Sequence, residues 1–170
     1  MKKFLIIGNM NAACYKDVFP YIKVNKVWFG EGKNLDFYLP DGTLKGTTSR
    51  WLTNIGKNNR KPLELTEHYS PEKYQKYDNY DAIEVGKVKN IPCDYYGEMG
   101  VPVTFLDKHC PEQFEIVGLL NHFKEADTEA GLLIGEDVPY TEKNGRVRPF
   151  RGGVIDGKQK YMRIIIRRRK

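Results

Sequence analysis

Apolar residues recur at alternate positions through residues 100–118, the most strand-like part of the chain. Val101, Val103 and Phe105 share one side of its first half, and residues 114–118 resume the apolar pattern after a polar turn containing proline. A period of two is typical of a half-buried strand, and proline cannot continue a sheet. The pattern therefore predicts a central hairpin made of two strands and a turn.

Two further segments are defined by their relation to this hairpin. Residues 161–167 contain three consecutive isoleucines and close the chain as a natural neighbouring strand. The long charged segment between them reads as an insertion, and its first part, residues 119–130, has helical spacing with an acidic face. We expect the insertion to carry function.

The N-terminal region predicts strands and one short helix. Residues 3–8 are a continuous apolar run ended by glycine, which is typical of a strand buried on both faces of an α/β sheet. Residues 15–23 predict a short helix in which Pro20 delays the start or causes a kink.

More strands are expected in the region that follows. Residues 27–29, 35–39 and 48–55 are strand candidates, and the Asp-Gly pair at 41–42 predicts a hairpin turn that would join the last two. The fold class predicted by these patterns is α/β, in the sense of a mixed α+β domain.

Composition narrows the class of protein. The chain has 170 residues, of which 40% are apolar and 29% charged, as expected of a globular domain with its own core. No apolar run approaches the roughly 18 residues that a membrane span needs. Three widely spaced cysteines fit a reducing compartment, so we expect a cytoplasmic protein.

Charge is distributed unevenly along the chain. Residues 143–170 hold eleven Lys or Arg and one acidic residue, a local charge of +10 within a total of +6, which leaves −4 for residues 1–142. A basic tail on a slightly acidic body suggests a polyanionic partner, most plausibly nucleic acid. The alternative is a solubilising terminus, against which the embedded isoleucines argue.

Two segments offer candidate contacts with DNA. The basic, amide-rich loop 57–61 follows Trp51 and Asn54, and such side chains contact phosphates and base edges. A solvated loop explains the same pattern. Residues 145–153 place three arginines among glycines and are the best phosphate-binding element in the chain.

Asn9 and Asn11 follow the first predicted strand. Ligands of open α/β sheets bind outside the carboxyl ends of strands, so these amides are candidates for contact with a base or a cofactor. Asparagine also caps helices and forms turns, and the sequence leaves both interpretations open.

Local motifs indicate no catalytic centre. The histidines at 68, 109 and 122 have no partner at ligand spacing, so we expect no metal site. No phosphate-binding loop and no Gly-x-Gly-x-x-Gly or Gly-x-Ser-x-Gly motif occurs.

Several blocks in order nevertheless resemble the C-terminal portion of the EcoRI-type adenine-specific DNA methyltransferases. The longest are MGVPVTFLD at 99–107 and PEQFEIVG at 111–118. The others are residues 3–9 with 11–12, 16–20, 26–30, 50–54, 77–82, 91–92 and 163–168. The resemblance covers nearly the whole chain.

The resemblance implies transfer of a methyl group from S-adenosylmethionine to the N6 of adenine in double-stranded DNA, within a restriction-modification system. It implies a Rossmann-like catalytic sheet and a flipped target base. The family's glycine-containing cofactor loop and its Asn-Pro-Pro-Phe motif are expected upstream of residue 3, and this sequence has no Pro-Pro pair. The chain therefore looks like the late strands of that sheet with a β-rich target-recognition part.

On this basis residues 1–40 are expected to end the catalytic sheet, 41–100 to recognise the target, and 101–170 to form the core hairpin, basic insertion and closing strand. The chain would need a missing N-terminal half to methylate. Alternatives are a stand-alone DNA-binding module or an inactive remnant. The expected site residues are Asn9 and Asn11 for the active-site wall and, for DNA, Arg50, Trp51, Asn54, Lys57, Arg60, Lys61, Arg146, Arg148 and Arg151.

Overall fold

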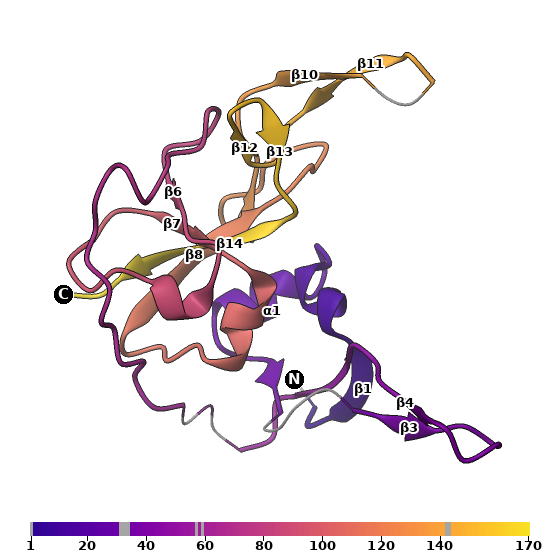
Figure 1. Ribbon diagram of the computed structural model, residues 1–170. Coiled ribbons are helices and arrows are strands. Elements are labelled where there is room, and N and C mark those ends of the chain that lie inside the picture. Colours follow the sequence, from indigo (N-terminus) through magenta and orange to yellow (C-terminus); the bar gives the residue numbers. More distant parts are fainter. Residues whose placement is uncertain (1, 31–34, 57, 59, 142–143) are drawn as a thin grey trace.

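A computed structural model describes all residues except 1, 31–34, 57, 59 and 142–143 (Figure 1). The described part is rich in strands, arranged in sheets that include both parallel and antiparallel pairs, with little helix. Its helical elements are α1 (Phe19–Lys23) and the 3₁₀ turns η1 (Met10–Cys14), η2 (Val88–Asn90) and η3 (Val103–Asp107). The mixed α+β class expected from the sequence is confirmed at this coarse level.

The largest sheet has five strands in the order β6-β7-β14-β8-β9. Its central strand runs antiparallel to both neighbours, and each outer pair is parallel. The strands are β6 (Ile83–Glu84), β7 (Met99–Val101), β14 (Arg163–Arg168), β8 (Phe114–Leu120) and β9 (Leu132–Leu133). The closing segment is thus a sheet neighbour as expected, but it lies between the two strands predicted to pair directly, so the central hairpin is wrong.

The predicted first strand of that hairpin is also too long. It ends at Val101, and residues 103–107 turn into η3 because Pro102 has no amide hydrogen to continue the ladder. Val103 and Phe105 are still buried, so the apolar pattern located the core correctly but not the backbone conformation.

Strand β14 is enclosed on both faces. Ile164 and Ile166 pack into the main core cluster, while Ile165 points to the opposite side and packs with Tyr77 and Leu120. All three isoleucines are 0% exposed. Period-two alternation therefore places apolar side chains in two separate clusters, one on each face of the sheet.

A second sheet has the order β1-β5-β2 and is antiparallel. Its strands are β1 (Leu5–Asn9), β5 (Ser49–Thr53) and β2 (Trp28–Phe29), so β1 lies at an edge. Leu5, Ile6 and Ile7 are 54%, 51% and 49% exposed. The strand was predicted correctly, but its burial on both faces is wrong, because among the described residues β1 pairs with β5 alone.

Helix α1 forms where the sequence predicts it and begins late. Pro20 occupies its first turn, where a missing amide hydrogen is tolerated. Phe19 and Ile22 are buried, and α1 packs against β8. It thereby links the N-terminal region to the five-stranded sheet.

The helix expected at residues 119–130 is wrong. Strand β8 runs on to Leu120, because Leu119 and Leu120 are fully buried beside β9 in the sheet. Residues 121–130 then form turns and irregular structure without a helix.

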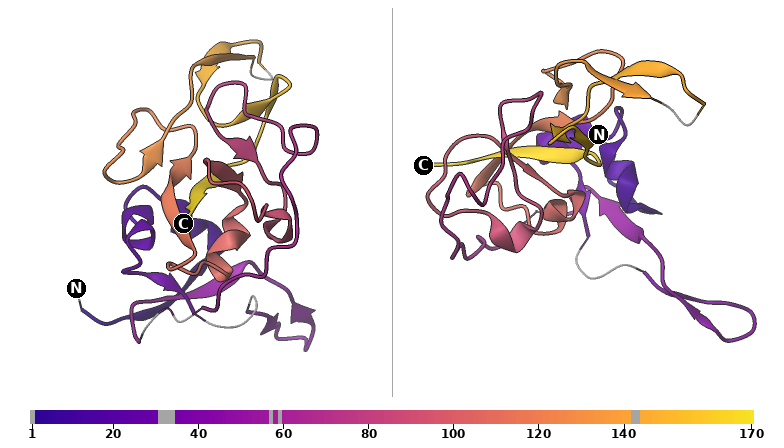
Figure 2. Two further views of the ribbon diagram at one scale, coloured as in Figure 1. Left: turned by 90° about the vertical axis from the view of Figure 1, so that its left-hand side faces the viewer. Right: turned by 45° about the horizontal axis from the view of Figure 1, so that its top comes forward.

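Two hairpins project from the body of the protein (Figures 1 and 2). One joins β3 (Phe37–Tyr38) to β4 (Leu44–Lys45) through the predicted Asp-Gly turn, with Gly42 at φ +82°. The partner of β3 is thus β4 and not the segment 48–55, which forms β5 instead. The other hairpin joins β10 (Val138–Thr141) to β11 (Val147–Phe150).

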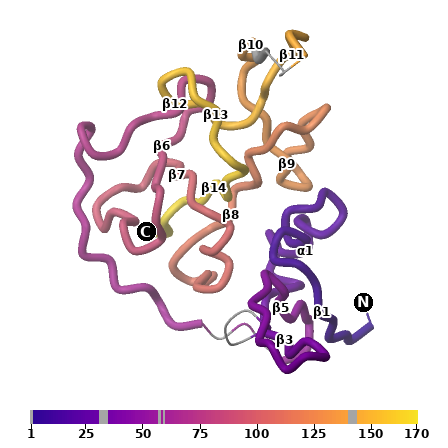
Figure 3. The backbone as a smooth tube through the Cα atoms, turned by 45° about the vertical axis from the view of Figure 1, so that its right-hand side comes forward, coloured from indigo at the N-terminus to yellow at the C-terminus, as the bar shows by residue number. Residues whose placement is uncertain are grey.

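A small hairpin of β12 (Val154–Ile155) and β13 (Lys158–Gln159) leads into the closing strand. The sheet that holds β1 and β5 lies to one side of the five-stranded sheet (Figure 3). It spans both sides of the expected boundary at residues 40 and 41. A search of the described residues found no helix long and apolar enough to cross a membrane.

Candidate nucleic-acid interface

Arg50 lies inside the protein. It lies on strand β5, where its side chain is 7% exposed and its guanidinium forms an ion pair with the Asp107 carboxylate at the end of η3. The guanidinium carbon also lies 5.6 Å from the centroid of the Phe29 ring. Contact between Arg50 and DNA stays a prediction, but in this structure the residue ties β5 to η3.

Arg60 is engaged in a similar way. Its Nη2 donates to the Phe29 carbonyl oxygen at 2.7 Å, and its Nε donates to the carbonyl of Asp107. Both arginines therefore converge on the junction between β2 and the end of η3. These contacts link the small sheet to η3.

The other candidates near β5 differ in accessibility. Trp51 is half-buried, and the Asn54 side chain accepts from the Phe4 amide at 2.8 Å and donates to the Lys2 carbonyl at 2.9 Å. Asn54 thus anchors the start of β1. Lys61 is exposed, and Lys57 lies outside the described residues.

The β10–β11 hairpin carries the most accessible arginines of the predicted set. Arg146 precedes β11 and Arg148 lies on it, and both are exposed. Arg151 follows at the base of the hairpin, where its Nε donates to Asp137 at 2.5 Å and its Nη1 to the Lys124 carbonyl at 2.5 Å. Two of the three arginines therefore lie on the projecting hairpin and the third fixes its base.

Asn9 and Asn11 lie at the end of β1, where η1 begins. The Asn9 side chain caps η1 by accepting from the Asn11 amide at 2.8 Å, and its Nδ2 donates to Thr48 Oγ1 at 2.9 Å. This is the capping role that asparagine offers at a helix start. Both residues are exposed, and a part in an active-site wall stays a prediction.

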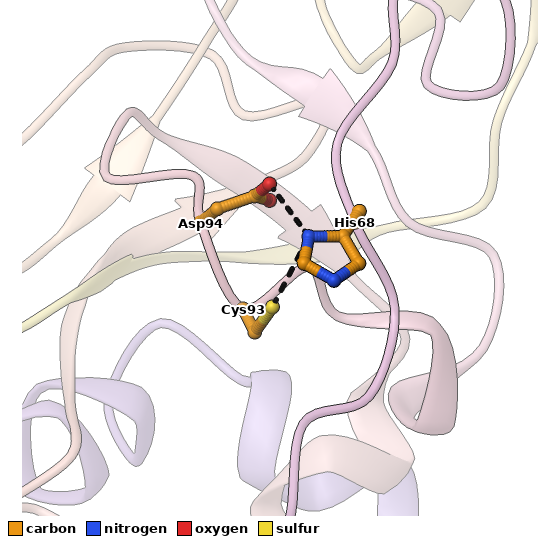
Figure 4. A group of neighbouring side chains, drawn as sticks. All are labelled: His68, Cys93 and Asp94. Atoms are coloured by element: carbon orange, nitrogen blue, oxygen red, sulfur yellow. Dashed lines mark hydrogen bonds and ion pairs between the residues drawn. The ribbon is translucent and has the colours of Figure 1, made fainter.

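A side-chain cluster that the sequence did not reveal is formed by His68, Cys93 and Asp94 (Figure 4). The fold thus places His68 beside two residues of ligand type, although no partner lies at ligand spacing in the sequence, and the expected lack of a metal site stays a prediction. The cluster joins two segments that are 25 residues apart, brought together by a parallel bridge between Glu67 and Pro92. Short-range ligand spacing cannot detect such a pairing, because no local motif encodes the bridge.

Comparisons with known proteins agree with the sequence blocks. The model of the family described as adenine-specific methyltransferase EcoRI matches residues 1–169. The type II methyltransferase M.EcoRI of Escherichia coli is 44% identical over 82% of this chain and 48% of its own length.

Two mycoplasma proteins are similar over nearly the whole chain. The type II methyltransferase M.MgeORF184P of Mycoplasma genitalium is 34% identical over 98% of this chain. The type II methyltransferase M.MpnI of Mycoplasma pneumoniae is also 34% identical, over 99% of this chain. Each match covers 57% of the relative. No solved structure matches the chain.

This chain thus spans about half the length of the curated relatives that it matches. The family match extends from the exposed first strand to the end of the buried closing strand. The chain belongs to the EcoRI family of adenine-specific methyltransferases.

Proposed function

We propose that this chain forms the target-recognition part and the late sheet strands of an S-adenosylmethionine-dependent DNA methyltransferase. In this proposal the complete enzyme methylates the N6 of adenine in double-stranded DNA as part of a restriction-modification system. The family supports the reaction. The single structural observation that supports the assignment of this chain to only part of the enzyme is the exposed strand β1.

Strand β1 has the composition of an interior strand and the position of an edge strand. Three consecutive apolar residues are about half exposed, and one edge of the strand has no partner among the described residues. Completing the burial of each side chain would contribute roughly 1 kcal/mol. An unpaired apolar edge is also a template for another strand. We therefore assign this edge to the remainder of a Rossmann-like sheet, supplied by the other half of the enzyme.

Catalytic chemistry is assigned to that other half. This sequence has neither a glycine-rich nucleotide motif nor a Pro-Pro pair, and Asn9 already uses its side chain to cap η1. These residues do not fit the task of holding S-adenosylmethionine, so we route no chemical step through them. Asn9 and Asn11 would instead border the site from the end of β1.

DNA contact is assigned to the projecting hairpin. Arg146 and Arg148 are exposed there, and arginine is well suited to phosphate oxygens because its planar guanidinium donates in pairs. Arg50 and Arg60 would act indirectly by holding the small sheet in place. Arg151 would do the same for the hairpin through its bond to Asp137.

The test is the salt dependence of duplex binding, measured by fluorescence anisotropy. Replacing Arg146 and Arg148 together by Ala should weaken binding and reduce the slope of log K against log salt by about 1.8, two phosphate contacts at about 0.9 each. The matched control replaces Lys87 and Lys89, an exposed pair near η2, and removes the same charge. Unchanged affinity and slope in the arginine variant would refute the hairpin assignment.

A stand-alone DNA-binding module is the second candidate, favoured by the exposed arginines on a projecting hairpin. It predicts duplex binding without any effect of S-adenosylmethionine and without gain of methylation when the other half is supplied. The two candidates are therefore separated by methyl transfer, not by DNA binding.

A further inference from the structure

We propose that His68, Cys93 and Asp94 form a binding site for Zn²⁺ or a chemically similar late first-row divalent cation. This site is independent of the proposed methyltransferase role. Figure 4 shows the three side chains pointing toward one another from two separate segments.

The distances fit a tetrahedral ion. His68 Nδ1 lies 3.0 Å from Asp94 Oδ2 and 3.7 Å from Cys93 Sγ, and the three ligand atoms all lie within 4.8 Å of one another. Bond lengths of about 2.0–2.3 Å at tetrahedral angles require ligand atoms roughly 3.3–3.6 Å apart. The two distances from His68 Nδ1 differ from this range by a few tenths of an ångström, and side-chain rotation would bring the Cys93 and Asp94 ligand atoms onto the same ion.

The backbone already holds the two ligand segments in place. The Cys93 amide donates to the Glu67 carbonyl at 2.8 Å, next to His68 in sequence. The Tyr69 amide donates to Asp94 Oδ1 at 2.8 Å, which leaves Oδ2 directed at His68. Such contacts to the non-ligating atom orient a carboxylate ligand. The site therefore costs little reorganisation on binding.

Packing beside the cluster reinforces this arrangement. The Tyr69 ring lies 4.6 Å from the Tyr95 ring and 5.9 Å from the Tyr74 ring, measured between centroids. Tyr69 and Tyr95 each neighbour a ligand residue in sequence. The aromatic contacts thus join the same two segments that supply the ligands.

The donor set selects the class of cation. A thiolate, an imidazole and a carboxylate suit Zn²⁺ and its neighbours, whereas Mg²⁺ and Ca²⁺ require oxygen ligands in greater number. An aspartate carboxylate is ordinarily ionised at neutral pH, so Asp94 supplies negative charge to a cation. His68 and Asp94 are exposed, so the fourth position would be open to water.

A bound ion would act as a clip between two stretches that contain little regular structure. Residues 61–70 form no strand beyond the isolated bridge at Glu67, and residues 92–96 form the other half of that bridge, a bend and irregular structure. Because binding to the folded state alone stabilises it, Zn²⁺ should raise the unfolding temperature of the chain.

The experiment titrates ZnCl₂ into the tag-free, fully reduced chain by isothermal calorimetry, with CoCl₂ as a spectroscopic probe. We expect one ion per chain and a thiolate-to-cobalt absorption band. His68→Ala, Cys93→Ser and Asp94→Asn should each weaken binding at least about tenfold, and Cys93→Ser should remove the band. Asp94→Asn keeps the acceptor for the Tyr69 amide and so preserves the local fold.

Cys110→Ser and His122→Gln are the matched controls, because they remove the same ligand types elsewhere and should leave affinity unchanged. Circular dichroism checks that each variant is folded. Absence of Zn²⁺ binding by the wild-type chain would overturn the proposal. Binding that survives all three ligand substitutions, or that is lost equally in the controls, would also overturn it.

Discussion

Two strands that each contain three consecutive aliphatic residues have opposite environments in this molecule. Ile164, Ile165 and Ile166 in β14 are 0% exposed, whereas Leu5, Ile6 and Ile7 in β1 are about half exposed. β14 has a strand on each side and a core cluster on each face. β1 has β5 on one side.

The difference shows that the burial of an apolar run depends on the strands and core residues that surround it, and not on the run alone. Residues far apart in the chain supply the neighbours of β14, namely β7 and β8. In our account the missing neighbours of β1 belong to the other half of the enzyme. In this account the two strands distinguish a completed sheet from one that another part of the enzyme would complete.

The largest expected effect comes from shortening one isoleucine in each strand. Ile165→Ala should lower the free energy of unfolding by roughly 2–5 kcal/mol, because the closed core leaves a cavity. Ile6→Ala should cost less than about 1 kcal/mol in the isolated chain, because its side chain is 51% exposed. Urea unfolding measures both, and equal costs would show that β1 is already packed.

Glycines in the two sheets offer a second, smaller contrast. A Cβ at Gly118 in β8 would lie 2.6 Å from the Gly131 carbonyl oxygen, a backbone atom that cannot easily move. At Gly8 in β1 it would lie 3.1 Å from Leu52 Cδ1, the end of a flexible side chain. Gly118→Ala should therefore cost about 1–3 kcal/mol and Gly8→Ala clearly less. Thermal unfolding of both variants checks this order.

The loss of folding stability at acidic pH should also arise in the region of the five-stranded sheet. His109 is buried and its Nε2 lies 3.1 Å from the Phe114 carbonyl in β8; burial lowers the pKa of this histidine. The unfolded chain binds the proton below about pH 6.5, so stability should fall as pH decreases from about 7 toward 5. At neutral pH and above, His109 is unprotonated in both the folded and the unfolded chain, so this loss of stability is absent.

His109→Gln should reduce that loss, because glutamine can donate to the same carbonyl without titrating. The comparison uses the urea midpoint at pH 7 and pH 5 for both chains. The exposed His122→Gln variant serves as the control. If the urea midpoint of His109→Gln falls between pH 7 and pH 5 by as much as that of the unmodified chain, His109 is not the source of the acid sensitivity.

Sequence patterns were informative where local chemistry decides the structure. The Asp-Gly turn, the late start of α1 at Phe19 next to Pro20, and the strand at residues 163–168 all follow from neighbouring residues. They misled where the outcome depends on distant partners. β14 lies between the two strands that were predicted to form a hairpin. Residues 119–120 extend β8 and pair with β9, although the sequence predicted a helix there.

The candidate site shows the same contrast between features set by neighbouring residues and features set by distant partners. The sequence predicted a phosphate-binding element at residues 145–153. The structure forms strand β11 within this segment and leaves Arg146 and Arg148 exposed, while their contact with DNA stays a prediction. Sequence patterns gave no sign that Arg50 would pair with Asp107, or that His68 would meet Cys93, because each pair is joined only by the tertiary fold.

The most direct test of the central claim replaces the matching part of the Escherichia coli relative with this chain and measures methyl transfer to adenine in duplex DNA. We predict transfer by the chimera and none by the isolated chain. Ile6→Asp should strongly reduce transfer by the chimera while the isolated variant still folds. Methylation by the isolated chain, or a folded chimera that is unaffected by Ile6→Asp, would contradict the account.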